Sequence, residues 1–424
     1  MNYLEMTKAE QQAQLEAMKV EYKKFQDMNL SLNMARGKPG ASQLDLTEGM
    51  LTVLSSSADC KAADGLDCRN YGVLDGIPEM KAMFAKVLGV NDSEIFVGGN
   101  SSLTMMFDAV AAMMTANPNG GTPWAKLDTV KWLCPVPGYD RHFGITEYFG
   151  IEMITVPMTA EGPDMDVIEK LVSEDASIKG IWCVPKYSNP QGITYSDETV
   201  RRFAQLKPAA DDFRIMWDNA YVIHDIAEEG DQLLNLMDEC KKNGTQDMPI
   251  IFASTSKITF PGAGVAAMAC SENNMKFFKK KYSAQAIGYD KLNMLRHVKF
   301  FGDYDGLMAH MQKHRAVLEP RFKAVIDKLE SNLAGCGVAQ WLNPKGGYFV
   351  SVDVMEGCAK RVVQLCKEAG VELTGAGATF PYGNDPQDSN IRLAPTLPPV
   401  EELEIAMDLF CLCTKLAALE KLTK

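Results

Sequence analysis

Residues 250–257 read Ile-Ile-Phe-Ala-Ser-Thr-Ser-Lys, a short apolar run that ends in small hydroxyl residues and one lysine. Residues 215–221 read Ile-Met-Trp-Asp-Asn-Ala-Tyr, so a second apolar run ends directly in an aspartate. Such short apolar runs are typical of strands that are buried on both faces of a sheet. Taken alone, Lys257 reads as a solvated lysine and Asp218 as a helix N-cap or loop residue. The surrounding pattern therefore decides how the two are interpreted.

Similar apolar runs recur along the chain and alternate with amphipathic helical stretches. We expect seven strands, at 94–97, 130–134, 153–157, 180–184, 214–217, 249–253 and 265–269. The helical stretches between them include 102–115, 165–174 and 196–206. This alternation predicts an α/β fold whose large domain holds a mostly parallel seven-stranded sheet covered by helices.

Beyond the last of these strands the pattern changes to that of a smaller α+β domain. Its expected elements are a long helix at 305–334, a strand at 348–354, a helix near 357–369, a strand at 390–393 and a final helix from 399. The first residues, with a helix at 7–28, are too few for a domain of their own, so we expect both chain ends to build this unit. The predicted division is 1–48, 49–304 and 305–424.

Composition and charge narrow the possible functions. The chain has 424 residues, 46% of them hydrophobic, which is enough for a large core, and a formal net charge of −12 that disfavours binding to nucleic acid or to anionic membranes. Its eleven cysteines show no CxxC or Cys/His pattern at metal-ligand spacing, so we expect reduced thiols, no metal site and a cytoplasmic location. The N-terminus does not resemble a signal peptide, and no apolar stretch is long enough to span a membrane.

Polar residues stand at the carboxyl ends of the predicted strands, where an open α/β sheet forms its ligand crevice. The loop Tyr-Ser-Asn-Pro-Gln-Gly at 187–192 is such a segment. By itself it reads equally well as a structural turn. An Asn-Pro-x-Gly loop followed by Asp-x-x-Tyr at 218–221 and Ser-x-Ser-Lys at 254–257 resembles the signature of fold-type I (class I/II) aminotransferases, which depend on pyridoxal 5'-phosphate (PLP).

The resemblance extends over most of the chain. It includes Gly98-Gly99-Asn100-Ser101-Ser102, Pro135-x-Pro137-Gly138-Tyr139, Tyr71-Gly72-x-x-x-Gly76 and Ile391-Arg392-Leu393-Ala394. The sequences of residues 34–39 and 256–264 are unusual for that family and resemble those of type Ic aspartate aminotransferases. This subgroup is related to the aminotransferase-like domain of MocR-type regulators.

The resemblance implies a role for each matching residue. Lys257 would be the catalytic amine that binds PLP covalently, and Asp218 would keep the pyridine nitrogen protonated so that the ring can accept electrons. Tyr139 would stack on the ring, although it also reads as a core aromatic. The implied cofactor-binding residues are Tyr71, Ser101, Ser102, Tyr139, Asn189, Asp218, Tyr221, Ser254 and Lys257.

The implied substrate is an amino acid with a second carboxylate. Arg392 would pair with the α-carboxylate, with Asn189 beside it, because a planar guanidinium matches that group. Arg36, next to Gly37 in the N-terminal loop, is the candidate for the distal carboxylate. It could equally form a salt bridge that fixes the N-terminal segment.

One departure from the family concerns the phosphate. Family members carry an arginine seven or eight residues after the lysine, where this chain has Gly264 and Val265. Lys291 or Arg296 could replace it, or both could be structural. We expect a homodimer in which Tyr71 reaches the neighbouring subunit's phosphate.

The expected activity is transfer of an amino group between L-aspartate and a 2-oxo acid such as 2-oxoglutarate. A fold-type I lyase, or an aminotransferase for other amino acids, remains an alternative. A PLP-binding sensor domain of a transcription regulator is less expected, since only 36 residues precede Gly37.

Overall fold

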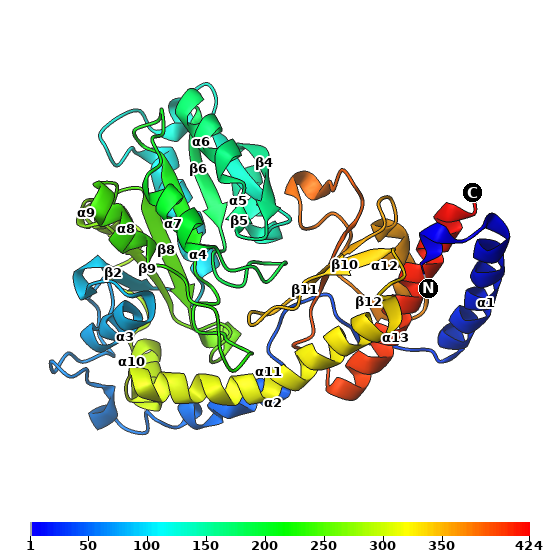
Figure 1. Cartoon of the computed structure of the whole chain (residues 1–424). Coiled ribbons are helices and arrows are strands. Elements are labelled where there is room, and N and C mark those ends of the chain that lie inside the picture. The colour runs from blue at the N-terminus through cyan, green and yellow to red at the C-terminus, as the bar shows by residue number, and fades with distance from the viewer. Residues whose placement is uncertain (1) are drawn as a thin grey trace.

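In the computed structural model, which describes residues 2–424, the chain forms two lobes joined by one long helix (Figure 1). The larger lobe is built on an eight-stranded sheet in the order β2-β9-β8-β7-β6-β3-β4-β5. These strands are β2 (Ile95–Gly98), β3 (Lys131–Val136), β4 (Glu152–Thr159), β5 (Gly162–Pro163), β6 (Ile178–Cys183), β7 (Arg214–Asp218), β8 (Pro249–Ser254) and β9 (Ala266–Cys270).

The middle of this sheet is parallel, and its edges are not. Strands β4, β3, β6, β7 and β8 pair in parallel, whereas β9 is antiparallel to both β8 and β2, and β5 folds back antiparallel on β4. The prediction of seven strands was therefore short by one, because two-residue β5 leaves no apolar run. The sheet is mixed, and its parallel centre brings the carboxyl ends of β3, β6, β7 and β8 to one edge.

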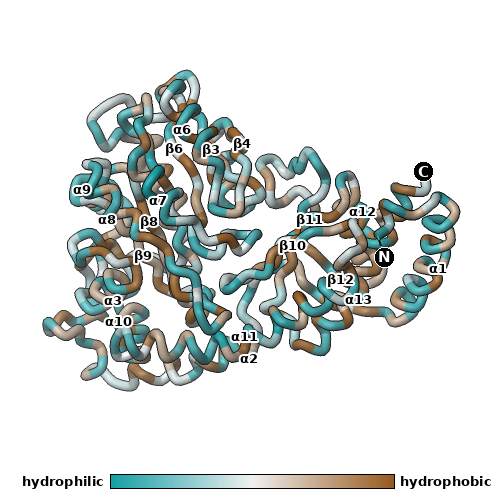
Figure 2. The backbone as a smooth tube through the Cα atoms, in the orientation of Figure 1, coloured by the Kyte–Doolittle hydropathy of each residue, from teal (hydrophilic) through white to brown (hydrophobic). Residues whose placement is uncertain are grey.

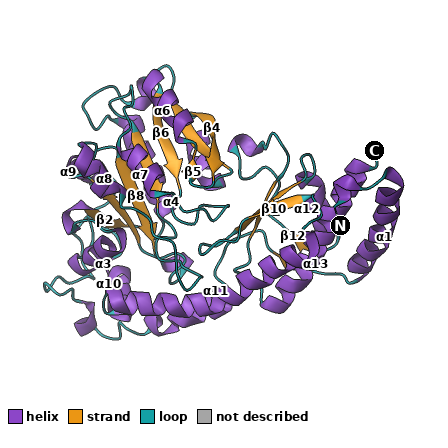
Figure 3. Ribbon diagram, in the orientation of Figure 1, coloured by secondary structure: helices purple, strands orange, loops and turns teal. Residues whose placement is uncertain are grey.

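Helices cover both faces of the sheet (Figure 3). Those of the larger lobe and its margin are α3 (Pro78–Leu88), α4 (Ser102–Thr115), α5 (Asp140–Tyr148), α6 (Met165–Glu174), α7 (Asp197–Ala204), α8 (Leu236–Asn243), α9 (Glu272–Tyr282) and α10 (Lys291–Phe301). Strands β6, β7 and β9 are buried along their whole length, and Figure 2 shows hydrophobic backbone in the sheet with hydrophilic stretches on the outer helices. Burial on both faces explains why the sequence shows a short apolar run in each of these strands.

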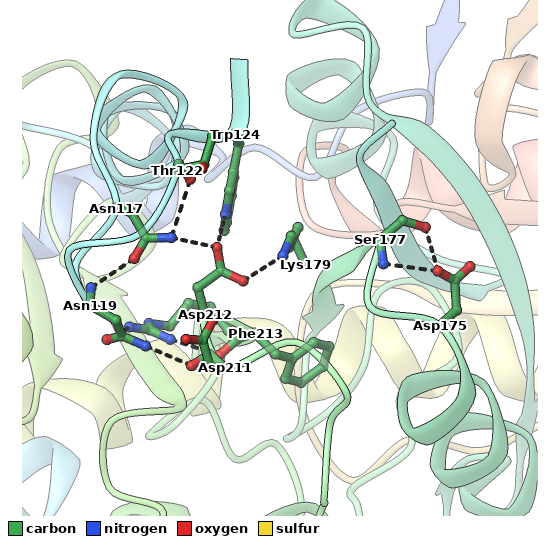
Figure 4. A network of polar contacts seen from close by, with 11 residues as sticks. Asn117, Asn119, Thr122, Trp124, Asp175, Ser177, Lys179, Asp211, Asp212 and Phe213 are labelled. Carbon is green, nitrogen blue, oxygen red and sulfur yellow. Dashed lines mark hydrogen bonds and ion pairs between the residues drawn. The ribbon is translucent and has the colours of Figure 1, made fainter. Parts of the chain in front are cut away.

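A buried polar network fixes the opposite edge of the sheet, away from the carboxyl ends (Figure 4). Asp212, just before β7, accepts hydrogen bonds from Trp124 Nε1 at 2.8 Å, Lys179 Nζ at 2.6 Å and Asn117 Nδ2 at 2.8 Å. A buried carboxylate is tolerated when a cation and further donors satisfy it. This network is structural and ties the starts of β6 and β7 to the loop after α4.

The smaller lobe combines the two ends of the chain. It holds a three-stranded antiparallel sheet, β10 (Ala339–Trp341), β11 (Val350–Val354) and β13 (Asn390–Leu393), and a parallel pair of β1 (Leu32–Asn33) with β12 (Val371–Glu372). Its helices are α1 (Lys8–Asp27), α2 (Ala41–Leu44), α12 (Ala359–Glu368) and α13 (Val400–Leu422). One hydrophobic core joins side chains of α1, such as Leu15 and Tyr22, with those of α13.

The long helix α11 (Tyr304–Leu333) runs along both lobes (Figure 1). Its first half packs beside α10 and α3, and its second half packs against α13. None of the helices within residues 2–424 has both the length and the apolar character needed to cross a membrane.

Candidate active site

A cavity of about 620 Å³ lies at the carboxyl edge of the main sheet, and both lobes contribute to its walls. Eleven of the twelve residues predicted to form a site line it: Arg36, Gly37, Ser101, Ser102, Tyr139, Asn189, Asp218, Tyr221, Ser254, Lys257 and Arg392. They come from the ends of β7 and β8, the loop after β6, the starts of α4 and α5, the N-terminal loop and β13. The parallel registry of the strands therefore gathers residues that are far apart in the sequence.

Lys257 lies in the turn after β8, beside two stacked aromatic rings. Its Nζ is 5.1 Å from the centre of the Tyr221 ring and 5.7 Å from that of Tyr348. Burial lowers the pKa of the Lys257 amine, and the nearby Asp218 carboxylate opposes this shift. A lowered pKa makes the neutral, nucleophilic amine more available than in a solvated lysine.

Asp218 ends β7 and is only 3% exposed. Its Oδ2 is 2.9 Å from His142 Nε2, while its Oδ1 is buried without a hydrogen-bond partner among residues 2–424. The His142 ring stacks on Trp182, with ring centres 4.6 Å apart, and this fixes its orientation. A buried carboxylate oxygen that lacks a donor indicates that a donor from a bound group belongs there.

The start of α4 contributes hydrogen-bond donors to the cavity. Ser101 is the N-cap, and its hydroxyl oxygen accepts a hydrogen bond from the Leu103 amide at 3.2 Å. Ser102 is the first residue of the helix and also lines the cavity. Ser254 and Ser256 line the same cavity, and their hydroxyls are 3.1 Å apart. Free amides at a helix start, together with serine hydroxyls, suit an anion such as a phosphate.

Arg392 projects from the middle of β13 and is 7% exposed. Its Nη1 donates to Asp140 Oδ1 at 2.9 Å and to Asn189 Oδ1 at 3.2 Å, and its guanidinium lies 4.8 Å from the centre of the Phe349 ring. Its Nε is buried and has no partner within residues 2–424. The guanidinium is thus held in place and still has N–H donors free to bind a ligand.

The N-terminal loop reaches the cavity because β1 pairs with β12 immediately before it. Gly37 fits tightly, since a Cβ at this position would lie 2.6 Å from the Phe349 ring. Arg36 is exposed, and its guanidinium makes no hydrogen bond or ion pair within the described chain. The alternative in which Arg36 forms a structural salt bridge receives no support from these contacts.

Three predicted candidates lie outside the cavity. Tyr71 does not line it and is 81% exposed. Lys291 is buried and donates to the Gly72 carbonyl oxygen at 2.9 Å, which gives it a structural role in this chain. Arg296 is half-buried and likewise does not line the cavity.

The structure also adds residues that the sequence reading did not select. His142 supports Asp218, and Asp140 and Arg141 face the cavity from the first turn of α5. One signal was present in the sequence: a histidine three residues after Tyr139 faces the same side of a helix. Nothing in the sequence indicated that Phe349 would pack between Gly37 and Arg392.

Comparison with known proteins places the chain among aminotransferases. Residues 6–424 match the family described as aspartate amino-transferase. An aspartate aminotransferase from Corynebacterium glutamicum is 47% identical over 406 residues, which cover 96% of this chain and 94% of that protein. The crystal structure of an aspartate transaminase from Corynebacterium glutamicum has a TM-score of 0.97 at 45% identity and covers 99% of both chains.

A more distant structure shares the fold. It is an α-aminoadipate aminotransferase from Thermus thermophilus, solved in complex with N-(5'-phosphopyridoxyl)-L-leucine. Its TM-score is 0.73 at 19% identity, with 92% of this chain and 93% of that chain covered.

Proposed function

The chain belongs to the aspartate amino-transferase family, and on this basis we propose that it transfers an amino group between L-aspartate and 2-oxoglutarate. It is a transaminase, and membership of the family implies PLP as the cofactor. The observation that carries the proposal is that Lys257, Asp218 and Arg392 face one cavity from the turn after β8, the end of β7 and β13. An amine, a buried carboxylate and a guanidinium are the groups that this reaction requires.

The residues present fit PLP. The unpartnered Oδ1 of Asp218 would accept a hydrogen bond from a protonated pyridine nitrogen, and His142 would hold the carboxylate in place. The start of α4, with Ser101 and Ser102, would bind the phosphate, together with Ser254. When bound, the cofactor supplies an electron sink for the negative charge that develops at the substrate Cα.

The protein's own groups then bind and orient the substrate. Arg392 would pair with the α-carboxylate, and its buried position on β13 fixes where that group lies. The Lys257 amine, with its lowered pKa, would act as the general base that takes the proton from the substrate Cα. The protonated amine would then act as the general acid that gives this proton back. Tyr221 and Asn189 line the same cavity and would hold the ring oxygen of the cofactor.

For the distal carboxylate we propose Arg36, since its guanidinium is unpaired and lines the cavity. Arg141 is the second arginine in the cavity wall without an ion pair in the described part of the chain. Either would attract a dicarboxylic substrate against the net charge of −12.

We also propose that the active unit is a homodimer in the cytoplasm, with the chain divided near residues 48 and 304. The exposed Tyr71 ring is available to a partner subunit, and no arginine follows Lys257 at the family's position. The eleven cysteines are unpaired, which favours a reducing compartment.

The experiment that tests the activity is incubation of the purified protein and PLP with L-aspartate and 2-oxoglutarate. Formation of oxaloacetate and glutamate in equal amounts supports the proposal. Release of ammonia without glutamate would instead indicate the lyase alternative. With alanine in place of aspartate, the rate measures how strongly the site selects a second carboxylate.

A further inference from the structure

Asp140 and Arg392 form an ion pair inside the cavity, and the two side chains differ in solvent exposure. The Arg392 side chain is 7% exposed and is carried by β13, whose backbone pairs with β11 at Ser351. The Asp140 side chain is 38% exposed and stands at the first position of α5. The guanidinium is therefore fixed by the fold, whereas the carboxylate can turn toward solvent by a rotation of its side chain.

The pair uses only part of Arg392. Asp140 contacts Nη1 through one oxygen, Oδ1, at 2.9 Å, so the contact is single rather than bidentate. The other neighbours of the guanidinium are neutral: the Asn189 amide oxygen and the Phe349 ring. Asp140 is thus the carboxylate that balances the charge of Arg392 in this cavity.

A substrate α-carboxylate needs the same guanidinium. If Asp140 remained in place, two carboxylates would share one cation at short range, and each would weaken the binding of the other. If Asp140 turns away, the incoming carboxylate takes over both its hydrogen bond and its charge. Its exposure makes the second course the easier one, because water can solvate the released carboxylate.

We propose that Asp140 pairs with Arg392 at the position that the substrate α-carboxylate takes, and that it is displaced when substrate binds. This inference rests on the proposed function, in which Arg392 binds the α-carboxylate. Asp140 keeps the buried guanidinium paired between turnovers and weakens the binding of every carboxylate ligand. It is a residue that sets affinity, and it leaves the chemical step unchanged.

The test is Asp140→Asn, which preserves the size of the side chain and an oxygen acceptor for Arg392 but removes the charge. Glu372→Gln is the matched control, because Glu372 also lines the cavity but its Oε2 bonds Asn33 Nδ2 at 2.6 Å. The PLP-loaded protein is titrated calorimetrically with succinate, a dicarboxylate that has no amino group to transfer. Aspartate kinetics are measured in parallel.

We expect Asp140→Asn to bind succinate about tenfold more tightly and to lower KM for aspartate by a similar factor with kcat little changed. Glu372→Gln should change either value less than about twofold. In an Arg392→Lys background, the effect of Asp140→Asn should shrink, since the shared partner is altered.

Weaker or equal succinate binding by Asp140→Asn would overturn the proposal, because Asp140 would then orient Arg392 rather than compete for it. An equal gain in succinate affinity in Glu372→Gln would also overturn it, since the effect would then come from the overall charge of the cavity and not from the pair with Arg392. If the protein did not transaminate aspartate but Asp140→Asn still bound succinate more tightly than the parent, only the proposed activity would be refuted.

Discussion

All five histidines of the chain are buried, with at most 4% of each exposed, and this predicts a specific sensitivity to acid. His297 shows the reason most clearly. Its Nδ1 is 2.8 Å from the Asn293 carbonyl oxygen and therefore carries the proton, so its Nε2 accepts from the Thr259 hydroxyl at 2.8 Å. Burial lowers the pKa of His297 from 6.5 to about 4, although the Asn293 carbonyl opposes the shift.

The size of the effect follows from the two pKa values. A group whose pKa is lower in the folded protein stabilises the fold fully above its unfolded value, here 6.5, and loses this contribution as the pH falls toward about 4. At about 1.4 kcal/mol per pH unit, the full loss is roughly 3 kcal/mol, of which roughly 2 kcal/mol has gone at pH 5. His314, whose pKa is also lowered to about 4 by burial, should behave in the same way.

The free energy of unfolding, measured by urea denaturation between pH 7.5 and 5, tests this reasoning. His297→Gln removes the titrating ring and keeps an amide that can bond the threonine hydroxyls. Between pH 7 and pH 5 we expect the free energy of unfolding of the parent to fall by roughly 2 kcal/mol more than that of His297→Gln. This holds whatever the difference in stability between the two proteins at pH 7. Identical losses in the two proteins would refute the assigned pKa. His314→Gln gives a second, independent comparison.

The remaining predictions concern the site. Lys257→Ala should abolish transamination, measured by glutamate formation, while the protein stays folded. It should still bind PLP, but without a covalent bond, so that dialysis removes the cofactor. Near-normal turnover would exclude Lys257 as the reacting amine. Asp218→Asn should lower kcat by several orders of magnitude, and a loss within about tenfold, little over 1.4 kcal/mol of barrier, would contradict its role. Light scattering should show a dimer, and Tyr71→Phe should raise the Kd for PLP; a fully active monomer would refute a shared site. Arg392→Lys should lower kcat/KM for aspartate and alanine alike, whereas Arg36→Ala should cost aspartate roughly 1.5–3 kcal/mol more than alanine, and equal losses would leave Arg36 structural.

The sequence allowed most of the main sheet to be predicted, for a physical reason. Strands buried on both faces, such as β7 and β8, need apolar residues along their centres, and such apolar runs are visible without a structure. Strand direction leaves no such trace. The run that forms β9 reads the same whether it is parallel or antiparallel to β8, so the mixed character of the sheet appears only in the structure.

The site residues that stand at or just after the end of a strand could be predicted from the sequence. Asp218 and Lys257 stand at strand ends, and a resemblance in motif order was enough to connect them. His142 and Asp140 were missed because they act through partners more than 70 residues away in the sequence, Asp218 and Arg392, which only the fold brings near. The sequence offers Lys291 as a candidate for the phosphate, yet its amine donates a hydrogen bond to the Gly72 carbonyl oxygen, a contact that composition does not reveal.

The pairing of β1 with β12 has a consequence for how the protein is made. Leu32 and Asn33 leave the ribosome long before their strand partners, Val371 and Glu372, are synthesised. Until then the loop carrying Arg36 has no strand partner beside it, while the strands of the larger lobe are already present. The main sheet can therefore form during synthesis, but the cavity is completed only when translation has passed Arg392, and a shortened nascent chain would lack the substrate site.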